Sequence, residues 1–461
     1  MQLDLRQIEA KATWLDHPAS VGRFSWHPRK NWLAVPSQKE RTIRIWDADT
    51  ATLRQTIAGP LDHVYEVIWN PGGELLATGS TDGSLKLWDA TTGEMYVSQE
   101  STTEHLQFSA DGSRLGVGQD GTRVRLFEVT SLGACRRLRS PSDGMVYRAA
   151  WNHDGSLIGA TSERVRFWNA EGYELASLPF HEPRSLFFCR DSLIVTGGGG
   201  VWRWPMRTAS ASGKLRVELG EPAALTRDAT RAYAAVSADE RRLAVVFDDG
   251  VRVFDLASPT PGLNPQVLAG HSRAHTISMS PDGRLLATGT YATGNDVWVW
   301  DTHTGQVLRK LPIPGGAAVA FAVNGKWLIT GSSEEFRCWD TATWKPGAVH
   351  PKHDQIGNLI AMSPRGTVAA IPYASNKVKM VNAATLEDVG EPDCGPHSPL
   401  CFGPDGSQFL SVNPQGYLFQ WDMAWVRQEV ARLQLDWKFP PLVHQPPPLL
   451  EEMVVPKASI P

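Results

Sequence analysis

Short apolar strands separated by tight turns repeat along most of the chain. In one of them Leu85 and Leu87 alternate with Lys86 before Trp88, and alternation with a period of two indicates a β-strand rather than a helix. Pairs of such strands are joined by turns such as Pro281-Asp282-Gly283, where glycine supplies the positive φ that tight hairpins need. Each unit is therefore predicted to be an antiparallel meander.

The last apolar strand of each unit ends in an aromatic residue followed by an acidic one. Full pairs are Trp46-Asp47, Trp88-Asp89, Trp300-Asp301, Trp339-Asp340 and Trp421-Asp422. Variants of the pair are Phe127-Glu128, Trp168-Asn169, Trp204-Pro205, Phe254-Asp255 and Val381-Asn382. These ten positions recur about every 42 residues, a spacing typical of repeat architectures in which each unit is one small sheet.

On these motifs the chain resembles the WD-repeat family of β-propellers over about residues 15–422. Gly270-His271 matches the Gly-His that opens a repeat in that family, and His63 occupies the same place in the second unit. The resemblance implies a hydrogen-bonded tetrad of His63, Thr78 or Ser80, Asp82 and Trp88. It also implies a structural role for the repeated positions, namely Trp46, Asp47, Trp88, Asp89, Trp168, His271, Trp300, Asp301, Trp339, Asp340, Trp421 and Asp422.

The predicted fold is all-β, a propeller of about ten four-stranded antiparallel blades within residues 1–422. The family resemblance suggests that residues 10–15 close the ring by completing the blade that ends at Trp421, which would leave no exposed sheet edge. Ten blades exceed the usual four to eight, so one wide ring and two smaller rings are both open. The interval between repeats is longest near residues 205–220, which predicts either a division of the chain or a long loop there.

The pattern changes after Asp422. Val426, Val430 and Leu433 have helical spacing, which predicts a C-terminal helix over 423–436. The Pro-rich segment 437–461 is predicted to be extended or disordered. This ending resembles the tails of bacterial WD-repeat regions found in large multidomain kinases, and suggests a bacterial WD-repeat protein.

Composition narrows the function classes. The formal charge is −4, so no basic excess points to nucleic acid. No apolar run approaches the length of about 18 residues expected of a membrane span, and the first residues do not form a secretory signal. Five scattered cysteines, with no Cys-x-x-Cys pair, indicate reduced thiols and a cytoplasmic location.

Catalytic and metal-binding motifs are missing from the sequence. It has no His-Glu-x-x-His, no Gly-x-Ser-x-Gly and no phosphate-binding loop. His350 with His353, and Cys394 with His397, have no third ligand nearby in the sequence, and metal binding needs more than two. We therefore expect no enzyme activity, no cofactor and no metal.

Three function classes remain open: a non-catalytic scaffold that binds a protein or peptide, a regulatory or sensor region of a kinase-linked signalling system, and a propeller enzyme with an unrecognised site at the channel mouth. For the scaffold, the positions at the start of the innermost strands predict the contact surface, since Tyr and Arg dominate interface energetics. Small residues hold four of these positions: Gly22, Ala232, Ala317 and Ser398. The predicted partner-binding residues are Tyr65, Glu104, Tyr147, Arg184, His275 and Asn358.

Overall fold

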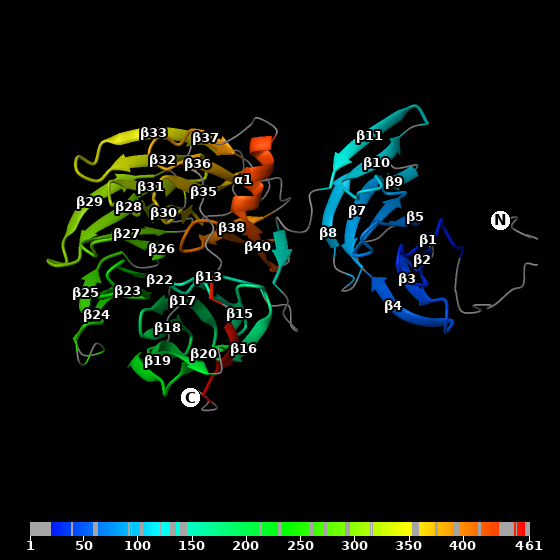
Figure 1. Cartoon of the computed structure of the whole chain (residues 1–461). Helices are drawn as coiled ribbons and strands as arrows, with labels where there is room; N and C mark the ends of the chain where they lie inside the picture. Colours follow the sequence, from blue (N-terminus) through cyan, green and yellow to red (C-terminus); the bar gives the residue numbers. More distant parts are fainter. Residues whose placement is uncertain are drawn as a thin grey trace, which may run out of the picture. The chain divides into compact units, whose positions relative to one another are not determined.

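The structure is a computed structural model of the 461-residue chain (Figure 1). It describes residues 20–37, 40–58, 63–90, 93, 95–101, 105–119, 121–129, 135–138, 145–211, 214–228, 233–258, 260, 262, 264–271, 274–290, 296–313, 315, 317–352, 359–373, 377–390, 397–413, 416–432, 447–448 and 450–456. These residues form ten sheets, which confirms the predicted all-β fold of about ten repeating antiparallel units. The chain divides into two compact units, Met1–Ser131 and Leu132–Pro461.

The first unit contains three antiparallel sheets. The first sheet has the order β1 (Ser25–Trp26), β2 (Trp32–Ser37), β3 (Thr42–Asp47) and β4 (Thr52–Ala58). The second has β5 (Val64–Trp69), β6 (Leu75–Ser80), β7 (Ser84–Asp89) and β8 (Met95–Glu100). The third has β9 (His105–Phe108), β10 (Arg114–Gln119) and β11 (Arg123–Glu128).

The second unit contains seven sheets, one for each remaining repeat. The first three, in chain order, contain β13 (Arg148–Trp151), β14 (Leu157–Thr161), β15 (Val165–Asn169) and β16 (Glu174–Leu178); β17 (Pro183–Cys189), β18 (Ser192–Gly197), β19 (Gly200–Ala211), β20 (Lys214–Leu219) and β21 (Ala223–Thr226); and β22 (Ala234–Val236), β23 (Arg242–Phe247), β24 (Gly250–Asp255) and β25 (Gln266–Ala269).

The other four sheets complete the ring. They contain β26 (Ala274–Met279), β27 (Leu285–Thr290), β28 (Asp296–Asp301) and β29 (Val307–Pro312); β30 (Ala318–Phe321), β31 (Trp327–Gly331), β32 (Glu335–Asp340) and β33 (Pro346–Pro351); β34 (Ala361–Met362), β35 (Val368–Tyr373), β36 (Lys377–Asn382) and β37 (Asp388–Gly390); and β38 (Ser398–Phe402), β39 (Gln408–Val412) and β40 (Leu418–Asp422), joined by β12 (Cys135–Arg137).

The seven sheets form a closed ring around their innermost strands. Strand β13 contacts β17 on one side and β38 on the other, so the first and last sheets of the unit are neighbours. Figure 1 shows the innermost strands β13, β22, β26, β30 and β38 gathered around the centre of this unit. Seven sheets lie within the usual range for propellers, and the question of one wide ring is thus resolved in favour of a separate seven-sheet ring.

The strand that closes this ring is β12, which differs from the expected closure. Cys135 pairs with Trp421 and Arg137 with Phe419 in an antiparallel register, and the Leu138 backbone N–H donates to the Leu418 carbonyl at 2.8 Å. The predicted closing segment, residues 10–15, lies outside the described residues. Among the described residues, the strand beside Trp421 is β12.

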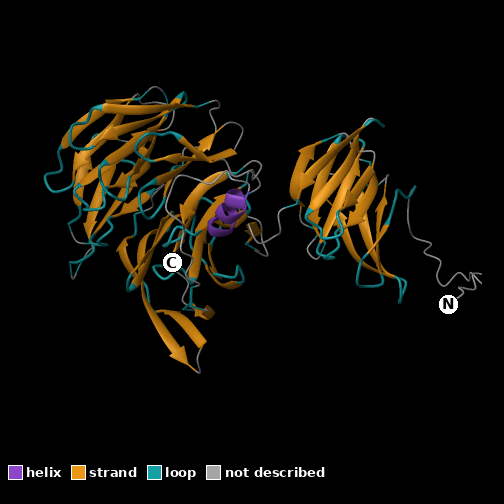
Figure 2. Ribbon diagram, turned by 45° about the horizontal axis from the view of Figure 1, so that its top comes forward, coloured by secondary structure: helices purple, strands orange, loops and turns teal. Residues whose placement is uncertain are grey.

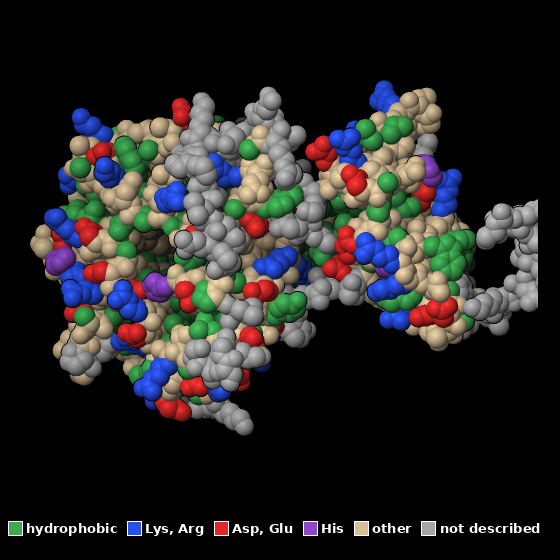
Figure 3. Space-filling view, in the orientation of Figure 1, with side chains coloured by type: hydrophobic (Ala, Val, Ile, Leu, Met, Phe, Trp, Pro, Cys, Tyr) green, Lys and Arg blue, Asp and Glu red, His purple; other side chains and the backbone are tan. Residues whose placement is uncertain are grey.

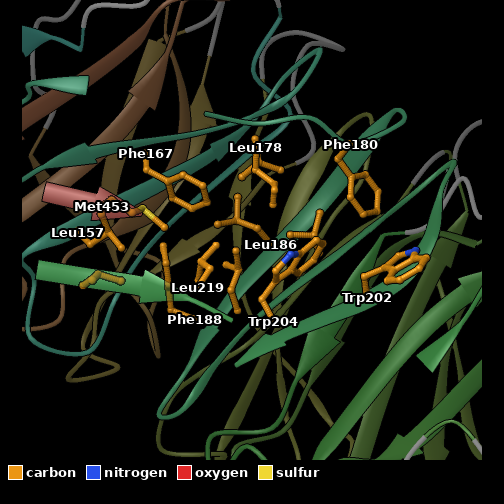
Figure 4. Close-up of a cluster of buried hydrophobic side chains, with 14 of the residues drawn as sticks. Leu157, Phe167, Leu178, Phe180, Leu186, Phe188, Trp202, Trp204, Leu219 and Met453 are labelled. Atoms are coloured by element: carbon orange, nitrogen blue, oxygen red, sulfur yellow. The ribbon is translucent and has the colours of Figure 1, made fainter. Parts of the chain in front are cut away.

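Neighbouring sheets pack face to face through apolar side chains. Figure 4 shows the cluster between the β13–β16 and β17–β21 sheets, where Leu186 and Phe188 lie close to Phe167. The Phe167 and Phe188 ring centroids are 6.3 Å apart, and Trp204 in the same cluster is fully buried. Burial of aromatic and branched side chains between successive sheets is what a single small sheet cannot achieve alone.

The chain does not divide where the longest interval between repeats suggested. Residues 205–220 instead form most of a long hairpin, in which Met206 of β19 pairs with Leu219 of β20. The division between the compact units lies at Ser131 and Leu132. The extra residues therefore extend one sheet rather than separate two rings.

The C-terminal segment begins with the predicted helix, α1 (Met423–Arg432), coloured purple in Figure 2. Asp422 caps it by accepting the Trp425 backbone N–H at 2.9 Å. The expected last turn, 433–436, lies outside the described residues. Within the tail predicted to be extended or disordered, β41 (Leu450–Val454) is extended and pairs in parallel with β20. Leu450 and Met453 are buried there, and this apolar contact orders the segment.

Replacing Met453 with Asp should lower the free energy of unfolding of the seven-sheet unit by about 2–3 kcal/mol, because a charge would enter an apolar cluster. Urea denaturation followed by tryptophan fluorescence measures this effect. Glu452→Gln is the matched control, since the Glu452 side chain is exposed and only pairs with Arg216. An equal loss in both variants would show that β41 does not contribute through burial.

Candidate functional site

The innermost strands of the seven-sheet ring all begin on one face, which we call the top face. Tyr147 directly precedes β13, Arg184 is the second residue of β17, and His275 is the second residue of β26. All three predicted residues therefore lie at equivalent positions on the top face. Ala317 and Ser398, predicted to offer little to a partner, lie at the starts of β30 and β38.

Two of the predicted residues contact each other across neighbouring sheets. The Arg184 guanidinium lies over the Tyr147 ring, 4.6 Å from its centroid, a cation–π geometry that orients both side chains. Glu182 lies 3.9 Å from the same guanidinium, but its side chain is mostly exposed. The arginine is therefore positioned mainly by the tyrosine.

A second group lies beside this pair. The Arg148 guanidinium is 5.0 Å from the centroid of the Tyr233 ring, and Tyr233 meets His275 edge-on with ring centroids 6.4 Å apart. Arg148 starts β13 and Tyr233 precedes β22, with the sheet of β17 between them in chain order. The contact consequently crosses the inside of the ring and joins non-adjacent sheets.

One buried hydroxyl fixes the backbone from which both arginines extend. Thr161 Oγ1 accepts the Arg148 backbone N–H at 3.1 Å and donates to the Arg184 carbonyl at 3.4 Å. Thr161 itself is fully buried in β14. Because three strands meet at this hydroxyl, the top-face arginines have rigid backbone supports, as a binding site requires.

The environment of Arg148 is electrostatically unusual. Burial lowers the pKa of its guanidinium, and nearby Tyr233 opposes that shift. No described carboxylate pairs with Arg148. A half-buried cation that faces aromatic rings without an anion is a candidate recognition point for a carboxylate.

The predicted contact residues belong to both compact units. Tyr65 belongs to β5 of the first unit, where its carbonyl accepts the Arg23 backbone N–H at 2.7 Å. Repeats that follow one another in sequence therefore fall in different units, and Tyr65 does not join Tyr147 and Arg184 in one ring of sheets. Glu104, Asn358 and Ala232 lie outside the described residues.

Sequence reasoning missed Arg148 and Tyr233. The signal for Arg148 was a charged residue at the start of an otherwise apolar strand, Arg148-Ala149-Ala150-Trp151. Tyr233 carried no such signal, because its partner lies 85 positions earlier in the sequence and two sheets away.

The repeated tryptophans hold adjacent strands together through hydroxyl groups. The indole Nε1–H of Trp88 donates to Thr78 Oγ1 at 2.8 Å, and that of Trp339 to Thr330 at 2.9 Å. In the second sheet the tetrad implied by the family is incomplete. The His63 side chain is exposed, and Asp82 instead accepts from the Ser84 backbone and the Lys86 ammonium.

Two other sheets do contain a histidine–hydroxyl–tryptophan triad. His271 Nδ1 lies 2.7 Å from Thr288 Oγ1, which also accepts from Trp300 at 3.0 Å. His397 Nδ1 lies 2.8 Å from Ser411 Oγ, which also accepts from Trp421 at 2.8 Å. Burial lowers the pKa of each histidine to about 4, so both are neutral near pH 7.

The acidic residue of the pairs caps the turn that follows its strand. Asp47 Oδ1 accepts the backbone N–H groups of Asp49 and Thr50, and the same pattern recurs two and three residues after Asp301 and Asp340. In the second sheet, Asp89 accepts from the Tyr96 hydroxyl. Trp46 and Trp168 are buried.

Comparison with known protein families agrees with the repeat period, the Trp–hydroxyl bonds and the closed ring. Segments 9–47, 51–89 and 263–301 match the WD40 model, described as "WD domain, G-beta repeat". These three segments are WD repeats, and the all-β fold of repeating sheets is consistent with a WD40 propeller. The remaining repeats of the chain diverge from the model but fold into sheets of the same kind.

Several curated WD-repeat relatives resemble this chain at low identity. It is 24% identical over 310 residues to protein tipD of Dictyostelium discoideum, covering 62% of this chain and 47% of the relative. It is 27% identical to the small ribosomal subunit protein RACK1y of rice (34% and 52%) and 26% identical to THO complex subunit 3 of Arabidopsis thaliana (32% and 48%). The chain thus spans about half the length of these relatives. They are eukaryotic proteins and give no support for a bacterial origin.

The described residues contain neither a membrane-spanning helix nor a metal-ligating cluster. None of their helices is long and apolar enough to cross a membrane, and they contain no group of three or more metal-ligating side chains. Of the histidines considered as metal ligands, His350 Nε2 pairs with Asp388 at 2.9 Å, His397 belongs to the triad above, and His353 lies outside the described residues, as does Cys394.

Proposed function

We propose that this WD-repeat protein is a non-catalytic interaction scaffold, and that the top face of its seven-sheet ring binds an acidic protein or peptide segment. The observation that carries the proposal is the pair of top-face arginines held against tyrosines, with Arg148 lacking a described carboxylate partner. Aromatic side chains supply contact area, and guanidinium groups bind carboxylates with two parallel hydrogen bonds.

The relatives support this kind of role. Their names describe one as a small ribosomal subunit protein and another as a subunit of the THO complex, so both are components of larger assemblies. The identity of the partner of this chain, its cytoplasmic location and any link to a kinase stay predictions.

The partner surface is confined to one part of the ring. Four successive sheets carry Tyr147, Arg148, Arg184, Tyr233 and His275. The sheets on the other side of the ring carry the small residues Ala317 and Ser398 at these positions. We therefore expect a lopsided contact in which a bound segment lies over β13, β17, β22 and β26.

Binding of a Glu-rich, fluorescently labelled peptide should be stronger than binding of the same peptide with Gln in place of Glu. The Tyr147→Ala/Arg184→Ala variant should lose about 30-fold in affinity, the size expected of an interface hot spot. Fluorescence anisotropy at two salt concentrations measures both effects, because carboxylate pairing weakens with salt.

Arg309→Ala is the matched control, since Arg309 is an exposed arginine on the outer strand β29. Its affinity for the Glu-rich peptide should equal that of the wild type. Equal binding of the Glu and Gln peptides, or equal loss in the control, would rule out the top face as an acidic-peptide site.

A further inference from the structure

The first unit ends in an apolar sheet face. On the sheet β1–β4, Trp26 pairs with Leu33, Leu33 with Trp46, and Trp46 with Leu53, so these four side chains form one row on one side of the sheet. Leu33 and Trp46 in the middle of the row are buried, whereas Trp26 and Leu53 at its ends are 55% and 43% exposed, and Phe24, two residues before Trp26, is 58% exposed. Figure 3 shows hydrophobic side chains gathered over β1 and β2.

This row points away from the second sheet. Ser25, the neighbour of Trp26, accepts the Trp69 backbone N–H on its hydroxyl and the Trp69 indole N–H on its carbonyl, both at 3.2 Å. Because adjacent strand residues face opposite sides, Ser25 faces β5 and Trp26 faces outward. Among the described residues no further sheet packs against this outer face.

The other end of the unit presents exposed apolar side chains beside glycines. On the sheet β9–β11, Gly116 pairs with Leu126 and Gly118 with Val124, and these two apolar side chains are 68% and 74% exposed. Large apolar side chains that stand beside glycines form a depression with an apolar wall. Exposed apolar surface of this kind is typical of an interaction site.

The seven-sheet ring shows how such a depression is filled. Gly159 of β14 lies four residues after a turn glycine, Gly155, just as Gly116 lies four residues after Gly112. A Cβ placed on Gly159 would be 2.6 Å from Leu186 and 3.0 Å from Phe188 of the next sheet. On Gly116 it would meet only its own sheet, with Gln107 at 3.6 Å and Leu126 at 3.8 Å.

The side chains that fill the Gly159 depression have equivalents in the first sheet. Phe188 pairs with Leu193 on the neighbouring strand, as Trp26 pairs with Leu33, and Leu186 and Phe24 each lie two residues earlier. One end of the first unit therefore carries the knobs, Phe24 and Trp26, and the other end carries the hole at Gly116. The unit has both halves of a sheet-to-sheet interface, which three sheets cannot join within one molecule.

We propose that two copies of this chain associate through their first units. Phe24 and Trp26 of each copy pack over Gly116 and beside Val124 and Leu126 of the other. Three sheets are too few to close a ring, whereas three from each copy make six, within the usual four to eight. The two identical interfaces are related by a two-fold axis, the commonest symmetry of soluble homo-oligomers.

Sedimentation velocity and light scattering on the full chain test the proposal. We expect a species of twice the chain mass that dissociates on dilution. Trp26→Asp and Gly116→Leu should each raise the dissociation constant at least about tenfold, one by charging the knob and the other by filling the hole. Gly116 does not have a positive φ, so leucine fits its backbone and the variant should keep its circular dichroism spectrum.

Val267→Asp is the matched control, because Val267 is a 53%-exposed apolar residue on β25 of the seven-sheet ring. Its dissociation constant should not change. A monomer at every concentration would overturn the proposal, as would trimers or open-ended polymers, in which the first units meet without closing a six-sheet ring.

Cross-linking gives an independent measurement of the contact. A mixture of Trp26→Cys and Gly116→Cys proteins under mild oxidation should give a covalent dimer on a non-reducing gel, at a yield well above that of either protein alone. Wild type and Val267→Cys report the background from the native cysteines. A yield in the mixture equal to this background would contradict the proposed contact even if the chain dimerises.

Discussion

Replacing Leu138 with proline should open the seven-sheet ring and lower its free energy of unfolding by about 3 kcal/mol or more. Proline has no N–H to donate to the Leu418 carbonyl, and the change also removes a leucine side chain that is 2% exposed. The edge of β40 would lose its partner strand. Hydrogen–deuterium exchange of Leu418–Asp422 should accelerate, and thermal unfolding should begin at a lower temperature.

A chain that lacks residues 1–18 is the contrasting control. Because β12 pairs with β40, this truncation should leave exchange of Leu418–Asp422 unchanged. Fast exchange after the truncation and slow exchange in Leu138→Pro would instead assign ring closure to the N-terminal residues.

Stability of the seven-sheet unit should fall as the pH decreases from about 6.5 to about 4. Burial lowers the pKa of His271 to about 4 and that of His397 to about 4. In this window the unfolded chain binds protons at both histidines and the folded chain does not, so acid favours unfolding. Each histidine should lower the free energy of unfolding by at most about 3 kcal/mol, and below pH 4 this loss of stability should level off.

Chemical denaturation at a series of pH values measures this dependence. His271→Gln and His397→Gln should each reduce the slope of the free energy of unfolding against pH by roughly half. His181→Gln, at an exposed position, should leave this slope unchanged. The glutamine variants will be less stable at neutral pH, and the slope is therefore the quantity to compare. An unaltered slope in both would show that the triads do not control acid stability.

The repeating sheets could be predicted from sequence because each is locally encoded. The alternation, the turn glycines and the Trp–acid pair of a repeat all lie within about 42 residues, and neighbouring strands in the chain pair with each other. Even the weakest repeat, which ends in Val381-Asn382, forms the sheet β34–β37. Local patterns thus predict how many sheets form.

The grouping of sheets into units could not be predicted in the same way. Residues 135–137 follow β11 in sequence and could have added a fourth strand beside it, but they pair with β40. The segment could pair with either sheet edge, and packing of Leu138 against Ile158 and Leu410 favours the edge of β40. That packing joins residues far apart in the chain, where no sequence period applies.

The candidate site was predictable in part for the same reason. The start of each innermost strand follows from the repeat, which places Tyr147, Arg184 and His275 on the top face. Tyr65 was misplaced because order in sequence is not order around one ring. His397 was missed as a triad member because Pro396 precedes it instead of the Gly of Gly270-His271, although the hydroxyl and the tryptophan were both present.

Ring closure by β12 also has a consequence for biosynthesis. Arg136 and Gln420 are hydrogen-bonded although they are 284 positions apart, so on the ribosome the closing strand emerges long before its partner. Until β40 is synthesised, the Leu138 side chain is not buried and the β12 backbone lacks its hydrogen-bond partners. This state favours chaperone binding or aggregation. The three sheets of the first unit need no such wait, since all their strands precede residue 131. The nascent chain should therefore fold in two stages, with a late and slow closure of the larger ring because its contacts are so distant in sequence.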